Sequence, residues 1–295
     1  MQNQGYKYLT AQIVERLRGA SLSVRRPMTG NRQGIHKSPA FGSSVEFAEY
    51  RRYYPGDPVG RIDWPVYARS DRYVIRQFHE DVSIRCFVLL DISESMNFRQ
   101  TGRISKIDYA CFVAAQIMYI ITHQGDTASL MTFDSDIRKH FDPAGSFTGL
   151  RPMLLALEQI KPERKGDIAA SLHRAAEMIP GKVLIVLISD LLQEPEKIIP
   201  ALTHLHHTGK DITVFHVLDP AEINTPDAGL VEIVSLETKE KITVDWAQIR
   251  SGYEAQVQKY FNELRTGCQN IRADYIIADT KTAPYDLVLK RSRSL

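Results

Sequence analysis

From about residue 84 onward, short apolar runs alternate with longer stretches whose apolar residues recur at steps of three and four. This alternation limits the possible folds more than any other feature of the chain. The short runs are almost continuously apolar, as expected for strands that are covered on both faces of a sheet. We predict strands over residues 86–90, 128–133, 183–188, 212–218 and 275–278, with an edge strand over 137–141.

The stretches between these runs predict helices that cover the sheet. Apolar residues at helical spacing mark residues 104–121, 150–160, 168–179, 198–205 and 246–264. Strands that alternate with helices are typical of an α/β fold with an open, mostly parallel, Rossmann-like sheet and helices on both faces. Two further apolar runs, 230–236 and 241–244, predict a hairpin inserted near residues 230–244 of this domain.

The first 83 residues do not follow this rhythm, and they differ in charge. They hold 13 Lys and Arg against 8 Asp and Glu, whereas the whole 295-residue chain holds 37 against 35 and has a net charge of +2. Because acidic residues are interleaved with the arginines and tyrosines, we expect arginine–carboxylate pairs here and no nucleic-acid surface. We therefore predict an irregular, Arg/Tyr-rich segment over 1–83, packed on a main domain over 84–295.

Cysteine usage and hydropathy bear on the compartment. The longest uninterrupted aliphatic run, residues 183–188, is far shorter than the roughly 20 residues of a membrane-spanning helix. Three cysteines, Cys86, Cys111 and Cys268, are an odd number at wide spacing and indicate neither a disulfide framework nor a zinc site. We expect a cytoplasmic protein without a membrane span.

One segment carries a pattern of oxygen ligands. Asp91, Ser93 and Ser95 follow the first core strand as Asp-x-Ser-x-Ser, and Asp190 follows the strand over 183–188. In open α/β sheets, ligands bind beyond the carboxyl ends of the strands, where the strand order reverses. Carboxylate and hydroxyl oxygens suit Mg²⁺. The four residues therefore predict a crevice with a magnesium site, although the same short motif also occurs as a capped turn.

This arrangement resembles the metal-ion-dependent adhesion site of von Willebrand factor A domains, whose fold is an open sheet flanked by helices on both faces. The resemblance implies a threonine on a later loop, but Gly166 stands at the best-matching position. Thr148 could replace that threonine only if the loops are arranged differently. An occupied magnesium site and one that is weak or lost both remain open.

A longer ordered string lies upstream, from Val45 to Trp64 (VEFAEYRRYYPGDPVGRIDW), and is followed by Ala68, Arg69 and the Asp91 turn. With this string the chain resembles the domain of unknown function 58 family over about residues 35–290. The resemblance implies a non-catalytic partner of MoxR-type AAA+ ATPases, which are thought to remodel or activate protein complexes.

Three functions are compatible with these residues. The leading hypothesis is a non-catalytic protein–protein interaction module, an adaptor whose crevice binds an acidic side chain of its partner with the help of Mg²⁺. The rival is a magnesium-dependent phosphatase or related hydrolase, but such an enzyme needs a general acid two residues after its nucleophilic aspartate, and Ser93 stands there. The third is a metal-free scaffold in which the Asp91 turn serves only as a cap.

Overall fold

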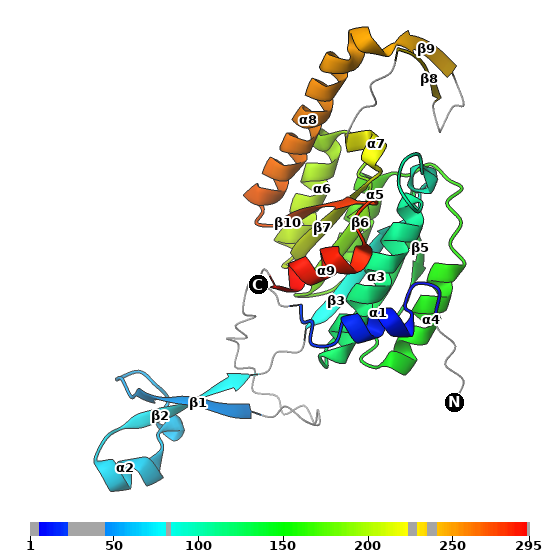
Figure 1. Cartoon of the computed structure of the whole chain (residues 1–295). Coiled ribbons are helices and arrows are strands. Elements are labelled where there is room, and N and C mark those ends of the chain that lie inside the picture. Colours follow the sequence, from blue (N-terminus) through cyan, green and yellow to red (C-terminus); the bar gives the residue numbers. More distant parts are fainter. Residues whose placement is uncertain (1–5, 23–44, 81–83, 224–228, 235–240, 294–295) are drawn as a thin grey trace. The chain divides into compact units, whose positions relative to one another are not determined.

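The computed structural model describes residues 6–22, 45–80, 84–223, 229–234 and 241–293. The chain divides into two compact units: the first combines Met1–Pro27 with Ile84–Leu295, and the second is Met28–Ser83. Figure 1 labels the helices and strands of both units. Each unit is described by itself.

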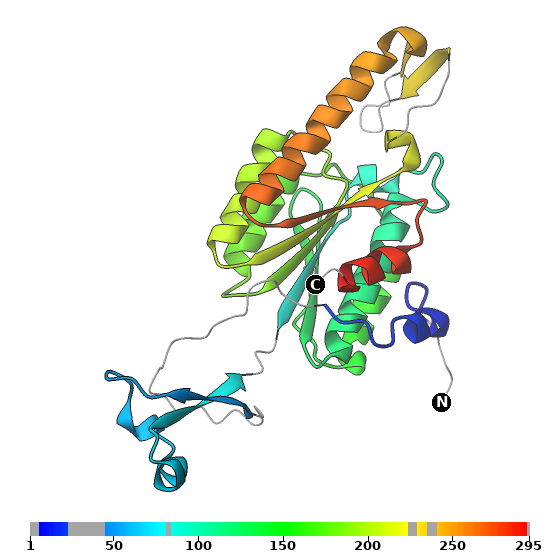
Figure 2. The ribbon, with the colours of Figure 1, turned by 60° about the vertical axis from the view of Figure 1, so that its left-hand side comes forward.

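A six-stranded sheet forms the centre of the first unit (Figures 1 and 2). Its strands are β3 (Arg85–Asp91), β4 (Thr127–Phe133), β5 (Ile137–His140), β6 (Leu184–Ser189), β7 (Asp211–Leu218) and β10 (Asp274–Asp279). They lie in the order β10-β7-β6-β3-β4-β5, and every neighbouring pair is parallel except β4 with β5. The chain passes from β3 to β4 on one side and later returns to β6 on the other. The strand order therefore reverses beside β3, and in open α/β sheets ligands bind beyond the carboxyl ends of the strands at such a point.

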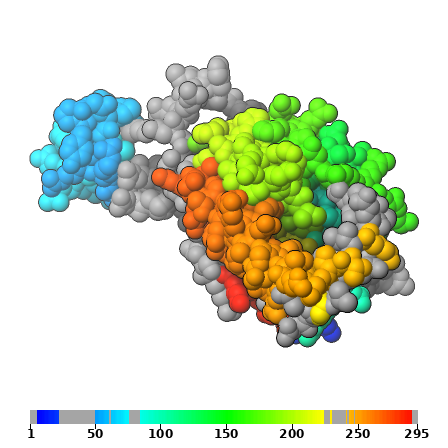
Figure 3. Space-filling view, turned by 90° about the horizontal axis from the view of Figure 1, so that it is seen from above, coloured from blue at the N-terminus to red at the C-terminus, as the bar shows by residue number. Residues whose placement is uncertain are grey.

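Helices cover both faces of this sheet (Figure 2). The first face packs against α1 (Ala11–Arg16), α3 (Lys106–His123), α4 (Phe147–Glu158) and α9 (Pro284–Arg293). The second packs against α5 (Ile168–Met178), α6 (Pro195–His207) and the long α8 (Trp246–Asn270). Helix α8 runs along α6 in the space-filling view (Figure 3). The predicted α/β class, an open and mostly parallel sheet with helices on both faces, is confirmed.

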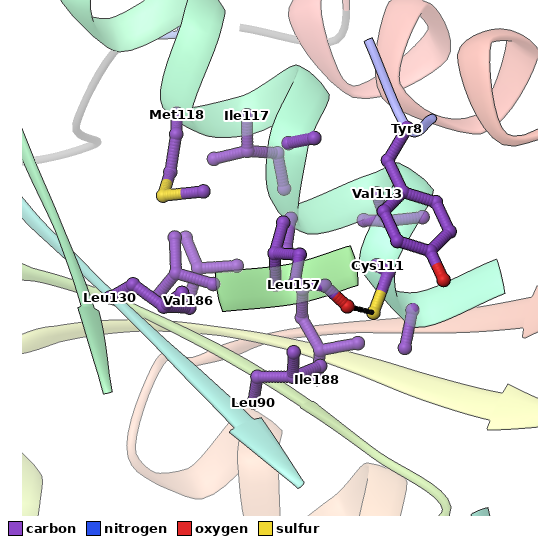
Figure 4. Close-up of a cluster of buried hydrophobic side chains, with 14 of the residues drawn as sticks. Tyr8, Leu90, Cys111, Val113, Ile117, Met118, Leu130, Leu157, Val186 and Ile188 are labelled. Carbon is purple, nitrogen blue, oxygen red and sulfur yellow. Dashed lines mark hydrogen bonds between the residues drawn. The ribbon is translucent and has the colours of Figure 1, made fainter. Parts of the chain in front are cut away.

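The two cores follow from the period of two residues in a strand. In β3, Val88 and Leu90 contribute to the core under α3, whereas Phe87 and Leu89 contribute to the core under α5 and α6. Figure 4 shows Leu90 and Ile188 on the strands beneath α3, with Cys111 Sγ of that helix 3.9 Å from the carbonyl oxygen of Leu157. Because both faces are covered, the strands read as continuous apolar runs in the sequence.

A short branch lies between β7 and α8. It holds α7 (Pro220–Ile223) and two antiparallel strands, β8 (Leu230–Val234) and β9 (Lys241–Asp245), at the position where the sequence predicts an inserted hairpin. The turn expected over residues 237–240 lies outside the described residues. No helix in the described ranges has the length and apolar character needed to cross a bilayer.

The second unit contains regular structure where the sequence predicts an irregular segment. Strands β1 (Val45–Arg52) and β2 (Val74–Glu80) pair antiparallel, and a 3₁₀ turn, η1 (Val59–Arg61), leads to α2 (Trp64–Ser70). Arg51 pairs with Asp57 at 2.8 Å, and the rings of Tyr67 and Tyr73 stack with their centroids 4.4 Å apart. One predicted arginine–carboxylate pair therefore forms inside this unit, while the predicted packing of the segment on the main domain stays a prediction.

The first residues of the chain belong with the main body. Tyr8, Leu9 and Leu17 are buried in the core that α3 covers, and the Tyr8 hydroxyl donates to Asp108 Oδ1 at 2.6 Å. The sequence grouped residues 1–83 as one N-terminal segment, but the compact second unit begins at Met28. The reason is that α1 is short and amphipathic, so its pattern does not reveal which core it completes.

Candidate functional site

The predicted crevice residues lie at one edge of the central sheet. Asp91 ends β3 and Asp190 directly follows β6, and these two strands pair in parallel with Leu90 opposite Ile188. Both aspartates are buried, at 0% and 3% exposure. The structure therefore brings together Asp91 and Asp190, which lie 99 positions apart in the sequence, at the point where the strand order reverses.

Asp91 accepts two short hydrogen bonds from its surroundings. Its Oδ1 accepts from the Ser93 backbone N–H at 2.9 Å, and its Oδ2 accepts from the Ser189 hydroxyl at 2.6 Å. Burial, together with the nearby charge of Asp190, raises the pKa of Asp91 to about 7, against the lowering effect of these hydrogen bonds. Both carboxylate oxygens are therefore fixed by hydrogen bonds, and burial makes the ionised form of the side chain unfavourable.

Ser93 and Ser95 face each other on the turn that follows. Their hydroxyl oxygens are 3.1 Å apart, and the short 3₁₀ helix η2 (Glu94–Asn97) begins between them. Gly166 lies against this turn: a Cβ placed there would be 2.9 Å from Ser93 Cβ. The Glu94 N–H donates to the Arg164 carbonyl at 2.7 Å, which fixes the two loops together. Gly166 therefore occupies the place beside the crevice that the sequence comparison assigned to a threonine, and it supplies no side-chain oxygen.

Thr148 lies at the other edge of the sheet. It belongs to the first turn of α4, just after Ala144, whose N–H donates to Ala128 near the start of β4. Strand β5 carries the chain back from the carboxyl end of β4 to its amino end, so α4 begins far from Asp91. The suggestion that Thr148 could act as a metal ligand is therefore incorrect.

Asp190 is paired with a buried lysine that the sequence did not indicate. Lys106 Nζ is 2.8 Å from Asp190 Oδ2 and 2.9 Å from Glu222 Oε1. The side chains of Lys106 and Asp190 are each 1% exposed, and that of Glu222 is 27% exposed. Burial acts to lower the pKa of Lys106, but the charges of Asp190 and Glu222 outweigh it and the pKa is raised. Lys106 is therefore a fixed ammonium ion at the crevice.

A buried histidine fixes the backbone of the loop that carries Asp190. His216 in β7 has its Nε2 at 2.8 Å from the Asp190 carbonyl oxygen and its Nδ1 at 2.5 Å from the Tyr275 hydroxyl. Burial lowers the pKa of His216 to about 4. A neutral ring suits this position because Nε2–H can donate to the carbonyl while Nδ1 accepts from the tyrosine.

The loop after the Asp91 turn is anchored by Asp219, which follows β7. Asp219 accepts from the backbone N–H groups of Gln100, Thr101 and Gly102, from the Thr101 hydroxyl and from the Ala221 N–H. A Cβ at Gly102 would lie 2.4 Å from Thr280 Oγ1, so only glycine fits this close approach. These contacts hold the loop over residues 98–105 against the ends of β7 and β10.

The residues present do not fit the divalent ion that the resemblance to a metal-ion-dependent adhesion site implies. Asp190 Oδ2 is bonded to the Lys106 ammonium, both oxygens of Asp91 accept hydrogen bonds, and Gly166 adds no ligand. Among the described residues, no three His, Cys, Asp or Glu side chains are grouped as a metal ion would require. A Mg²⁺ ion at the predicted site would first have to displace a buried ammonium, and the magnesium site stays an untested prediction.

The same contacts bear on the rival hydrolase. A nucleophilic aspartate needs an oxygen that faces its substrate, but the Asp91 side chain is fully buried and both oxygens are engaged. Ser93 takes the position where such an enzyme carries its general acid. The geometry gives no support to a covalent phosphatase mechanism.

Five residues that contribute to the site were not predicted from the sequence: Lys106, Ser189, His216, Asp219 and Glu222. Lys106 lies between Ser105 and Ile107 at the start of a helix, and nothing local marks it as buried. The sequence does contain a signal for Asp219 and Glu222. The segment Asp-Pro-Ala-Glu places both carboxylates directly after a core strand, which is also the position of Asp91 and Asp190.

The chain is similar to known proteins in sequence and to solved structures in its coordinates. An uncharacterized protein of Mycobacterium tuberculosis (strain ATCC 25618 / H37Rv) is 26% identical over 233 residues, which cover 77% of this chain and 72% of that protein. Among solved structures, the conserved hypothetical protein BatB from Bacteroides thetaiotaomicron has a TM-score of 0.47 at 14% identity, over 71% of this chain and 97% of that one. A von Willebrand factor type A structure from Catenulispora acidiphila has a TM-score of 0.44 at 13% identity, over 75% of this chain and 44% of that one. At these values the likeness assigns no residue role to this chain.

A family profile gives the firmest relationship. The profile described as protein of unknown function DUF58 matches residues 49–262, which is more than half of the chain and includes the Asp91 turn, Lys106 and Asp190. The chain therefore belongs to the family described as protein of unknown function DUF58.

Proposed function

We propose that this chain is a non-catalytic protein–protein interaction module that docks a partner at the crevice edge of its sheet. The observation that carries the proposal is Leu192, which is 64% exposed only two positions after the buried Asp190. An apolar side chain of this size, displayed beside the switch point of an α/β sheet, is suited to contact another protein.

The loop that displays Leu192 is firmly held. Leu191 adopts a φ of 51°, a left-handed conformation that is unfavourable for leucine, and its side chain is fully buried. The Tyr260 hydroxyl donates to the carbonyl oxygens of Leu191 and Gln193, and Gln193 Nε2 donates to Asp167 Oδ1 at 3.1 Å. Leu192 is therefore presented on a preorganised loop, which lowers the entropy lost when a partner binds.

The charge around this loop indicates the chemistry of the partner. Arg99 and Arg103 are exposed on the loop after the Asp91 turn, and Arg164 is exposed on the loop whose carbonyl accepts from the Glu94 N–H; within the described part of the chain none of the three forms an ion pair. Glu163 and Glu194 are exposed in the same loops as Arg164 and Leu192. Together with Leu192 these three arginines form what we call the crevice rim. A cationic rim around an apolar anchor favours an acidic segment that carries an apolar side chain. Carboxylates of the partner would meet arginine side chains directly.

The family resemblance supplies a candidate for that partner. We propose a MoxR-type AAA+ ATPase, with this chain as its adaptor in the assembly or activation of a protein complex. Docking through the arginines and Leu192 requires no divalent ion, so the interaction is expected to proceed without Mg²⁺.

The test is the affinity between this chain and a purified MoxR-type ATPase from the same organism. Leu192→Ala is expected to weaken binding by about tenfold, the factor to which ~1.4 kcal/mol corresponds. Leu155→Ala is the matched control, because Leu155 is 42% exposed on α4 and lies away from the crevice rim. Equal affinities of wild type and Leu192→Ala would show that the partner does not dock at the crevice rim.

A charge-reversal pair tests the arginines separately. The double variant Arg99→Glu, Arg103→Glu is expected to slow association and to weaken its dependence on salt, because rim charges steer encounter. Lys182→Glu provides the control, since Lys182 is exposed before β6 at the opposite edge of the sheet. Because the double variant reverses two charges and Lys182→Glu reverses one, a pure net-charge effect would give the control half of the change in the logarithm of the association rate, and that result would mean that the rim has no special part.

A further inference from the structure

The cation at the crevice is part of the chain itself. Lys106 is the first residue of α3, directly after the N-cap Ser105, and its side chain is 1% exposed. A lysine is almost never buried to this extent unless it is paired. The side chain lies inside the crevice even though a helix N-terminus is unfavourable for a positive charge.

Two carboxylates from separate strands converge on this ammonium. Asp190 follows β6 and Glu222 lies in α7 after β7, and both are within 2.9 Å of Lys106 Nζ. Glu222 is itself fixed, because its Oε2 accepts from the Asp219 N–H at 2.7 Å. The Phe98 ring lies 5.5 Å from the ammonium nitrogen and contributes a cation–π contact. All of these contacts favour a positive charge at the position of Lys106 Nζ.

We propose that Lys106 is a built-in replacement for a divalent metal ion, so that the crevice keeps its carboxylates together without binding Mg²⁺ or Mn²⁺. Asp190 and Glu222 contact the same nitrogen atom, and two carboxylates this close to each other repel unless a positive charge lies between them. The ammonium supplies that charge permanently, and a divalent ion could bind Asp190 Oδ2 only by displacing the ammonium from it. This role of Lys106 does not depend on which partner binds the chain.

Removal of the Lys106 charge should create a divalent-cation site. Lys106→Met keeps the length and apolar stem of the side chain but leaves Asp190 and Glu222 without a counter-ion. Those carboxylate oxygens, with water, are hard ligands that suit Mg²⁺ and Mn²⁺. The variant is therefore expected to gain a divalent-cation site that the wild-type chain lacks. Lys106→Arg retains a cation and is expected to gain none.

The experiment follows free Mn²⁺ by its electron paramagnetic resonance signal while full-length protein is added, with circular dichroism to show that each variant is folded. The expected result is loss of the free Mn²⁺ signal with Lys106→Met, and no loss with wild type or Lys106→Arg. Binding of Mn²⁺ by wild type that Asp91→Asn abolishes would overturn the proposal. A folded Lys106→Met variant that leaves the signal unchanged would overturn it equally, because the ammonium would then not be what excludes the metal.

A second measurement covers the case in which Lys106→Met folds only in part. Because an ion that binds only the folded state stabilises it by mass action, the melting temperature of this variant should rise with increasing Mn²⁺. The wild-type melting temperature should not change over the same range. A Mn²⁺-independent melting temperature for both chains would contradict the proposal.

Discussion

At the scale of single residues, Asp219 shows how one carboxylate can organise a loop. It accepts hydrogen bonds from Gln100, Thr101, Gly102 and Ala221, and it is fully buried. Burial acts to raise its pKa, but these donors outweigh burial and the pKa is lowered to about 2. Charge-assisted hydrogen bonds of this kind are worth more than neutral ones.

Asp219→Ala would leave several buried N–H groups without an acceptor. We expect a loss of unfolding free energy on the order of 3 kcal/mol, measured by urea denaturation. Since the pKa of Asp219 is depressed, its contribution is present above the ordinary value of about 4 and is lost as the pH falls toward 2. Asp142→Ala, at an exposed position, should change the unfolding free energy little. A small effect at Asp219 would mean that the loop does not depend on it.

Asp91 and His216 should give opposite pH dependences. The pKa of Asp91 is raised to about 7, so the folded chain retains a proton that the unfolded chain loses, and this contribution to stability falls as the pH rises from about 4 to 7. The pKa of His216 is lowered to about 4, so its contribution rises with pH over much of the same interval. The two effects partly cancel in the wild-type chain.

Asp91→Asn removes only the first of these contributions. The unfolding free energy of the variant relative to wild type should therefore increase as the pH is raised from about 4 to 7. Denaturant titrations at several pH values measure it, with Asp142→Asn as a control whose offset should stay constant. A pH-independent difference between Asp91→Asn and wild type would show that Asp91 is charged throughout.

At the scale of the element, α8 contains two glycines in different surroundings. A Cβ at Gly252 would meet no atom within 4 Å, whereas one at Gly267 would lie 2.6 Å from Ile199 Cγ1 of α6. Helix α8 therefore needs its second glycine for close packing but not its first. Gly252→Ala should stabilise the chain by about 0.5–1 kcal/mol through the helix propensity of alanine.

Gly267→Ala should have the opposite sign. Overpacking against Ile199 is expected to cost about 1–3 kcal/mol, because α6 or the Ile199 rotamer must shift. The two substitutions are chemically identical in one helix, so thermal denaturation of both separates packing from propensity. If Gly267→Ala also stabilises the chain, α6 and α8 are not in close contact at this point.

Local patterns were sufficient for the elements of the central sheet but not for the charge balance of the crevice. The strand runs and the Asp91 turn are continuous in sequence, and Asp190 follows from the rule that parallel strands share an edge. The bond from Lys106 to Glu222 joins residues 116 positions apart, and no periodicity reports such a contact. Of the two strands in the second unit, a run over residues 72–78 predicts β2, but β1 escaped because Val45–Arg52 mixes charged and aromatic residues and lacks a clean alternation.

At the scale of the whole molecule, the first residues complete the core of the main body. Leu17 is 1% exposed, and the Leu22 N–H donates to Gln124 Oε1 at 3.0 Å. Leu17→Ala should cost about 2–5 kcal/mol of unfolding free energy through the cavity that it creates. Leu192→Ala, at a side chain 64% exposed, should stay within about 0.5 kcal/mol of wild type. Equal effects would mean that the N-terminal residues are not part of the folded core.

At this scale the chain is a docking module in which the Lys106 ammonium, bonded to Asp190, takes the place of a metal ion. The most direct test is the dissociation constant of the complex with the purified MoxR-type ATPase, measured once with excess EDTA and once with Mg²⁺, with the ATPase held in one nucleotide state that needs no added metal. The account predicts the same dissociation constant in both buffers. Binding that disappears in EDTA and returns with Mg²⁺ would contradict it.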